Sequence, residues 1–181
     1  GSGVSSSAAF EVLIGTILSG LYNGGSVSAV KIAQIAQYAE NVYFGKPSGL
    51  MDQMASSVGG FITIDFKDTE NPLISSIEYD FAHSGYSLCL VDTKGSHADL
   101  TPDYAALPAE MKAAAAVFGK SVLREVDEAD FRNNIGLVRE KCGDRAVLRA
   151  LHFFDENKRV DAAAVSLKCK DIEGFLDVIK A

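Results

Sequence analysis

The stretch GSGVSSSAA at residues 1–9 runs directly into an amphipathic segment over residues 8–21. Gly1 and Gly3 permit backbone conformations that other residues avoid, and the serines are suited to cap the start of a helix. Unpaired amides and the positive end of the helix dipole stabilise an anion at such a position. The stretch therefore predicts a phosphate site, although Gly-Ser-Gly is also a common linker remnant and serines before a helix are often only caps.

The composition of the chain argues against several classes of protein. The chain has 181 residues, of which 48% are hydrophobic, and a formal net charge of -7. It has no stripe of Lys and Arg that would neutralise nucleic-acid phosphates, and no apolar run long enough to span a bilayer. The widely spaced cysteines favour reduced thiols over a disulfide framework or a zinc site; they are Cys89, Cys142 and Cys169. We expect a cytoplasmic protein whose partners include neither nucleic acid nor a membrane.

The spacing of apolar residues predicts an α+β fold. A period near 3.6 indicates helices, and alternation indicates short strands. Helices are expected over residues 8–21, 28–42, 50–57, 109–118, 128–142 and 144–168, with a last one capped by Asp171. Strands are expected over residues 61–66, 74–81 and 86–92. Three or more antiparallel strands would then pack against several helices.

Two carboxylates have positions that suit phosphoryl transfer. Glu40 is expected in the last turn of a helix, where the dipole disfavours a negative charge and a magnesium ion would relieve it. Asp52 is expected near a helix N-terminus after the Pro47 turn, placed to accept a proton from a hydroxyl group. Each has an alternative reading, because a solvated glutamate at a helix end and a first-turn aspartate are both common.

Three segments in this order resemble the GHMP kinase superfamily and, within it, the galactokinases. They are Gly-x-Gly-Val-Ser-Ser-Ser-Ala from residue 1, Glu40-Asn41-x-x-Phe44-Gly45, and Gly49-x-Met51-Asp52-Gln53. The likeness extends more loosely through Tyr104 and residues 123–126 to residues 145–164. It implies ATP-dependent phosphorylation of galactose at the anomeric hydroxyl, with Mg²⁺ as cofactor and ATP as co-substrate.

The resemblance also implies a role for each matching residue. Ser7 and Glu40 would hold Mg²⁺, Asp52 would be the catalytic base, and Gly49 and Tyr104 would contact the sugar together with Asp52. The residues implied to bind the ATP phosphates are Gly1, Ser2, Gly3, Val4, Ser5, Ser6 and Ser7. Residues 92–100 depart from the family pattern, so another sugar acceptor stays open. A sugar and ATP sensor without catalysis is a further alternative.

The fold implied by the resemblance has two domains. Residues 1–106 would be the C-terminal portion of the ATP-binding domain, which is similar to the second domain of ribosomal protein S5. Residues 107–181 would be the helical start of a ferredoxin-like C-terminal domain. The first and third family motifs are expected outside this chain, in missing segments of a longer parent protein. We therefore expect the isolated chain to have no kinase activity.

Overall fold

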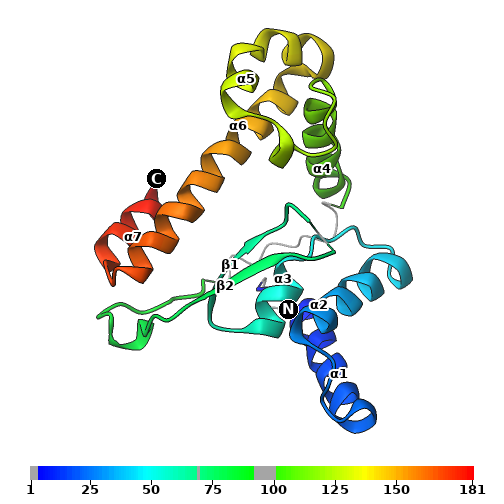
Figure 1. Cartoon of the computed structure of the whole chain (residues 1–181), viewed down its shortest axis with the longest axis vertical. Coiled ribbons are helices and arrows are strands. Elements are labelled where there is room, and N and C mark those ends of the chain that lie inside the picture. Colours follow the sequence, from blue (N-terminus) through cyan, green and yellow to red (C-terminus); the bar gives the residue numbers. More distant parts are fainter. Residues whose placement is uncertain (1–3, 69, 92–100) are drawn as a thin grey trace. The chain divides into compact units, whose positions relative to one another are not determined.

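Two compact units make up the chain (Figure 1), and the computed structural model describes residues 4–68, 70–91 and 101–181. Unit 1 comprises Gly1–Ile64 and Ile74–Thr101, and unit 2 comprises Asp65–Leu73 and Pro102–Ala181. Each unit is described by itself. None of the helices among the described residues is both long and apolar enough to cross a membrane.

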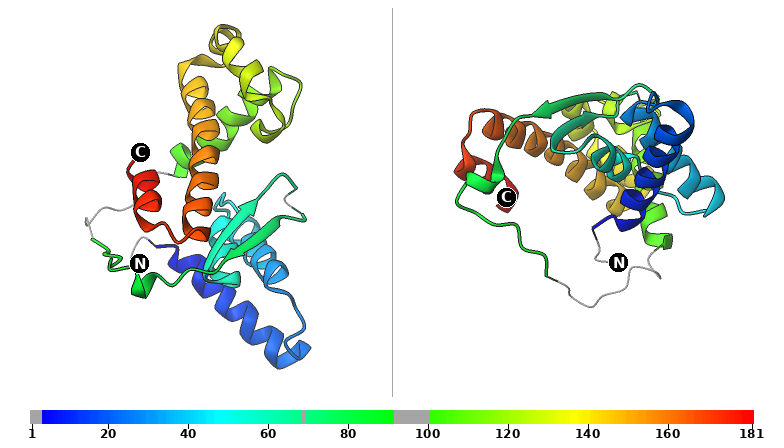
Figure 2. Two further views of the ribbon diagram at one scale, coloured as in Figure 1. Left: turned by 60° about the vertical axis from the view of Figure 1, so that its left-hand side comes forward. Right: turned by 90° about the horizontal axis from the view of Figure 1, so that it is seen from below.

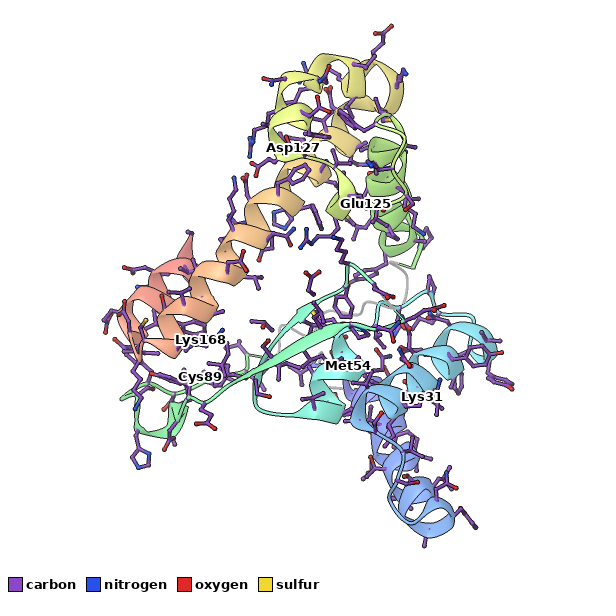
Figure 3. The ribbon with its side chains drawn as sticks, in the orientation of Figure 1. Lys31, Met54, Cys89, Glu125, Asp127 and Lys168 are labelled. Atoms are coloured by element: carbon purple, nitrogen blue, oxygen red, sulfur yellow. The ribbon has the colours of Figure 1, made fainter. Side chains whose placement is uncertain are left out.

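Three helices of unit 1 pack against one another in pairs: α1 (Ser6–Asn23), α2 (Ala29–Tyr38) and α3 (Met51–Val58). Helix α1 ends at Gly24, which has the left-handed conformation that glycine adopts without strain. Helix α2 starts at Ser28, whose hydroxyl accepts a hydrogen bond from the Lys31 amide and so confirms the expected cap. Fully buried Met54, labelled on α3 in Figure 3, belongs to the packed interior of this unit.

The described residues form one antiparallel sheet of two strands, β1 (Phe61–Asp65) and β2 (Leu73–Ile77). Beyond β2 the chain forms a short 3-10 turn at Phe81–His83, so the strand expected over residues 74–81 ends early. Residues 86–91 form no strand, and Leu88 and Val91 are 85% and 83% exposed. The alternating pattern there gains no buried face, so the expectation of three or more strands is not confirmed.

Unit 2 is helical, with a 3-10 turn at Leu123–Glu125 between its first two helices. The helices are α4 (Thr101–Ala116), α5 (Glu128–Asn133), α6 (Ile135–Lys168) and α7 (Ile172–Lys180). The apolar faces of α4, α5 and α6 meet around Phe131 and Val138, which have no exposed surface. Helix α7 packs against α6 (Figure 2).

Several helix boundaries differ from the expected ones. Helix α4 begins at Thr101 rather than at residue 109, and Pro108 lies inside it although proline lacks the amide that an internal position donates. The helix expected over residues 128–142 is divided at Asn134 into α5 and the start of α6. Gly143 interrupts α6 with φ 84°, which confirms the expected break between residues 142 and 144. Asp171 caps α7 by accepting a hydrogen bond from the Gly174 amide, as expected.

Candidate functional site

The serine-rich loop leads into α1 without a side-chain cap. Ser5 has a left-handed backbone (φ 53°, ψ 39°) and its hydroxyl makes no cap hydrogen bond, so the expected capping role is wrong at this position. The amide of Ala9 donates to the Ser5 carbonyl at 3.1 Å and closes the first helical turn. Amides that precede this bond have no acceptor within the helix and are suited to bind an anion. Residues 1–3, which carry the first part of the predicted phosphate loop, lie outside the described residues.

Glu40 is buried, with 4% of its surface exposed, and lies in a π-helical turn (Ala39–Tyr43) that follows α2. Its Oε1 atom accepts hydrogen bonds from Ser7 Oγ at 3.0 Å and from Lys46 Nζ at 2.6 Å. Its Oε2 atom accepts one from Gln53 Nε2 at 2.8 Å. The alternative of a solvated glutamate at a helix end is therefore wrong, and the fold joins Ser7 to Glu40 across 33 residues of sequence.

The surroundings shift the pKa of two carboxyl groups in opposite directions. Burial opposes ionisation of Glu40, but hydrogen bonds, led by that from the Lys46 ammonium, bring its pKa below the ordinary value. For Glu11 on α1, burial and then the negative charge of Glu40 raise the pKa. The Oε2 atom of Glu11 is buried without a hydrogen-bond partner among the described residues. The carboxyl group of Glu11 therefore lies close enough to Glu40 for the charge of Glu40 to raise its pKa.

The turn between Glu40 and α3 is held by polar contacts. Asn41 Oδ1 accepts a hydrogen bond from the Ser48 amide at 2.8 Å, and Asn41 Nδ2 donates to the Ser48 carbonyl at 3.2 Å. The Lys46 amide donates to the Glu40 carbonyl at 3.2 Å, which a positive φ of 67° at Gly45 allows. These bonds set the path of the chain into α3.

The predicted sugar-binding residues of unit 1 are open to solvent. Gly49 is exposed in the turn, and Asp52 is exposed in the first turn of α3. Within the described part of the chain Asp52 makes no hydrogen bond or ion pair that would occupy its carboxylate. Tyr104 lies on α4 of unit 2 and is 49% exposed. The contact of Tyr104 with the sugar stays a prediction, as does the catalytic role of Asp52.

The pair formed by Ser7 and Glu40 suits Mg²⁺. The ion prefers oxygen ligands and is usually bound through one or two carboxylates together with substrate phosphates and water. Ser7 Oγ and Glu40 Oε1 are two such oxygens, 3.0 Å apart at the start of α1. No group of three or more His, Cys, Asp or Glu side chains that could hold a metal ion is found in residues 4–68, 70–91 and 101–181. The donor set present therefore fits an ion that phosphate groups help to hold.

An apolar groove of about 520 Å³ borders this pair. Its polar lining comes from Ser7, Glu11, Glu40 and Lys46. Its apolar lining comes from α1, α2 and the turn after them: Phe10, Ile14, Gly15, Leu18, Ile32, Ile35, Ala36, Ala39 and Phe44. The hydrogen-bonded pair of Ser7 and Glu40 thus lies at the edge of a surface on which apolar side chains predominate.

Three residues that surround Glu40 are not predicted from the sequence: Glu11, Lys46 and Gln53. Glu11 follows Ser7 by one helical turn, which places both on one face of α1. That spacing could have found Glu11. The π-helical turn that places Lys46 and Gln53 against Glu40 has no comparable signal in the sequence.

Comparison with known proteins gives the families that this chain resembles. Residues 1–60 match the family described as GHMP kinases N terminal domain. The chain is 35% identical over 94% of its length to a galactokinase of Streptomyces coelicolor, of which it covers 43%. Its identity is 34% over 94% of its length to galactokinases of Actinobacillus pleuropneumoniae and Mycobacterium tuberculosis, of which it covers 43% and 46%.

The chain thus spans less than half the length of these relatives. The family match contains both members of the hydrogen-bonded pair, since Ser7 and Glu40 lie within residues 1–60. The similarity to galactokinases extends over both compact units, because it covers 94% of the chain. Residues 1–60 accordingly resemble the N-terminal domain of GHMP kinases, and the chain as a whole is similar to galactokinases.

Proposed function

We propose that the protein containing this chain is a galactokinase that transfers the γ-phosphoryl group of ATP to the anomeric hydroxyl of galactose, yielding galactose 1-phosphate. One observation carries the proposal: Ser7 Oγ and Glu40 Oε1 lie 3.0 Å apart at the N-terminus of α1. Phosphoryl transfer requires a phosphate cradle, oxygen ligands for Mg²⁺ and a group that orients or deprotonates the acceptor. The relatives named above support galactose as the acceptor.

In this proposal the chain's own residues hold the nucleotide phosphates and the ion. Amides of residues 1–7, from Gly1 to Ser7, bind phosphate oxygens at the start of α1. Ser7 and Glu40 hold Mg²⁺, which when bound neutralises charge on the phosphates. Gln53 holds Oε2 of Glu40 through its 2.8 Å hydrogen bond and thereby orients the carboxylate.

Asp52 is the proposed general base for the sugar hydroxyl. Its carboxylate is exposed in the first turn of α3, so an acceptor can reach it. It directly precedes Gln53, whose side chain is bonded to Glu40, so one short helix connects the base to the metal ligand. Gly49 and Tyr104 complete the proposed contacts with galactose.

We also propose two domains for this chain and a cytoplasmic location for the protein. Residues 1–106 are assigned to the ATP-binding domain, similar to the second domain of ribosomal protein S5, and residues 107–181 to the start of a ferredoxin-like domain. A cytoplasmic location is supported by the free thiols of Cys89, Cys142 and Cys169.

The test is Asp52→Asn in the full-length protein, with Asp161→Asn on α6 as a matched control. We expect kcat to fall by about 10²- to 10⁴-fold for the first variant, with galactose binding retained. Unchanged turnover would remove Asp52 from the role of base. A wild-type protein that binds galactose and ATP without turnover would be a sensor, and preference for another sugar would revise the acceptor.

The isolated 181-residue chain is expected to show no kinase activity. Support comes from its coverage of the galactokinase relatives, which is 43% for the Streptomyces coelicolor protein. Galactose-dependent formation of ADP by the purified chain would contradict this expectation.

A further inference from the structure

We propose that Lys46 is a further functional residue of this site. Its ammonium group holds the Glu40 carboxylate while no divalent cation is bound, and it moves to a phosphate oxygen when a metal–polyphosphate complex binds. The inference rests on the proposed function, because it takes Ser7 and Glu40 as the metal ligands.

Lys46 and a metal ion would compete for one oxygen atom of Glu40. Lys46 Nζ lies 2.6 Å from Glu40 Oε1, the atom that also accepts the Ser7 hydroxyl. The other oxygen, Oε2, faces Gln53. Oε1, which Ser7 and Lys46 share, would therefore be the oxygen through which Glu40 held a cation. Two positive charges cannot share that atom without strong repulsion, so the ammonium must leave.

The carboxylate of Glu40 is held in place, whereas the ammonium of Lys46 can move. The Glu40 side chain is 5% exposed, whereas that of Lys46 is 58% exposed. The Lys46 backbone is held by its amide bond to the Glu40 carbonyl at 3.2 Å. Lysine carries its charge on a flexible four-carbon stem. The ammonium can therefore swing outward while its attachment point stays beside the site.

The displaced ammonium of Lys46 would have a second anion within the same groove. Phosphate groups are expected at the amides of α1 that precede the bond from Ala9 to Ser5. Ser7, Glu40 and Lys46 all line the same groove at this end of the helix. Lysine binds phosphate as a point charge, without the geometric demands of arginine. A phosphate oxygen of the bound complex is thus the anion that replaces Glu40 as its partner.

The test compares the binding of two probes to the 181-residue chain: Mn²⁺ alone, and Mn²⁺ with tripolyphosphate. Free Mn²⁺ is measured by electron paramagnetic resonance for wild type, Lys46→Met, Lys46→Arg and Lys31→Met. Lys31 is an exposed lysine of α2 (Figure 3) and controls for the loss of one positive charge. We expect Lys46→Met to bind Mn²⁺ alone more tightly and the tripolyphosphate complex more weakly, each by roughly five-fold. Lys46→Arg is expected to retain binding of the complex.

Glu40→Gln separates failure of this inference from failure of the proposed function. If Glu40→Gln weakens binding of both probes but Lys46→Met changes neither, the role of Lys46 is overturned and the metal site stands. If Glu40→Gln has no effect, or if no form of the chain binds Mn²⁺, the role of Lys46 and the metal site formed by Ser7 and Glu40 are both overturned. Changes of the same sign for the two probes, or equal changes in Lys31→Met, would show a general charge effect and overturn the role of Lys46.

Discussion

The two units differ in how they bury apolar side chains. In unit 2, helices α4, α5 and α6 surround a continuous core that contains Phe131, Val138 and Phe154. In unit 1, the buried cluster on α1 and α2 consists of Val12, Ile32 and Ala36, with Val27 against it. The apolar stripe of α1 is 40% to 69% exposed: Phe10, Leu13, Ile14, Ile17, Leu18 and Leu21.

The polar network around Glu40 lies in the unit with the smaller buried cluster. Ser7 on α1, Gln53 on α3 and Lys46 in the turn all donate to one buried carboxylate. Hydrogen bonds to a charged group contribute more to stability than bonds between neutral groups. Unit 2 is therefore stabilised chiefly by apolar packing, and the helices of unit 1 are connected also by the residues proposed to bind the ligand.

The largest expected effect is on the core of unit 2. Phe131→Ala removes a ring without exposed surface that contacts Phe118 and Phe154. We expect unit 2 to lose about 3–5 kcal/mol, measured by urea unfolding and amide hydrogen exchange. The matched control is Phe10→Ala, because Phe10 is 64% exposed and should change stability by about 0.5 kcal/mol or less. Equal effects of the two substitutions would contradict the contrast between the units.

A smaller effect is expected in the interior of unit 1. Met54→Ala removes a fully buried side chain of α3 and should cost about 2–4 kcal/mol by the same measurements. Met51 on the same helix is 61% exposed, so Met51→Ala serves as control. A cost for Met54→Ala no greater than for Met51→Ala would mean that α3 is not held by burial.

Glu40 and Glu11 of unit 1 should respond oppositely to pH. Because the pKa of Glu40 is lowered by folding, its contribution to stability is present above the ordinary pKa and is lost as pH falls through the folded value. The pKa of Glu11 is raised, so its contribution is present below the ordinary pKa and is lost as pH rises through the folded value. Near neutral pH, Glu40→Gln should destabilise unit 1 and Glu11→Gln should stabilise it.

Urea unfolding at neutral pH and at about pH 4 checks this prediction, since ordinary glutamate titrates near the lower value. Both effects should become smaller at the lower pH. Shifts of the same sign for Glu40→Gln and Glu11→Gln at neutral pH would contradict the opposite directions assigned to their pKa values.

The smallest effects are expected at helix caps. Asp171→Ala removes the side chain that accepts from the Gly174 amide, and should destabilise α7 by about 1 kcal/mol. Ser5→Ala removes a hydroxyl that makes no cap bond at α1, and should change stability by less than about 0.5 kcal/mol. Hydrogen exchange of each helix distinguishes the two outcomes, and a larger loss at Ser5 would restore the capping role expected from the sequence.

Local signals predicted much of the helical structure. Ser28 and Asp171 cap helices as expected, and Gly143 interrupts α6 where the apolar pattern breaks. The start of α4 before Pro108 could not be predicted, because proline more often begins a helix than lies inside it. Alternation over residues 86–92 predicts a strand that residues 86–91 do not form, because a strand needs a partner that the local pattern does not specify.

Part of the candidate site could be predicted from two separate segments that resemble family motifs. Ser7 and Glu40 were expected to act together, and the fold brings them into hydrogen-bond contact. Lys46 and Gln53 reach Glu40 through a π-helical turn and a loop with positive φ at Gly45. Such backbone geometry depends on tertiary contacts, such as those between Asn41 and Ser48, which spacing alone does not specify.

The central claim is that Ser7 and Glu40 form a metal–phosphate site at the N-terminus of α1. Paramagnetic broadening of amide resonances by Mn²⁺ and ATP, measured on the 181-residue chain, tests it most directly. We predict broadening concentrated at residues 5–9 and 39–47, and its loss in Glu40→Gln. Broadening that persists unchanged in Glu40→Gln, or that centres on the exposed carboxylates of unit 2, would contradict the claim.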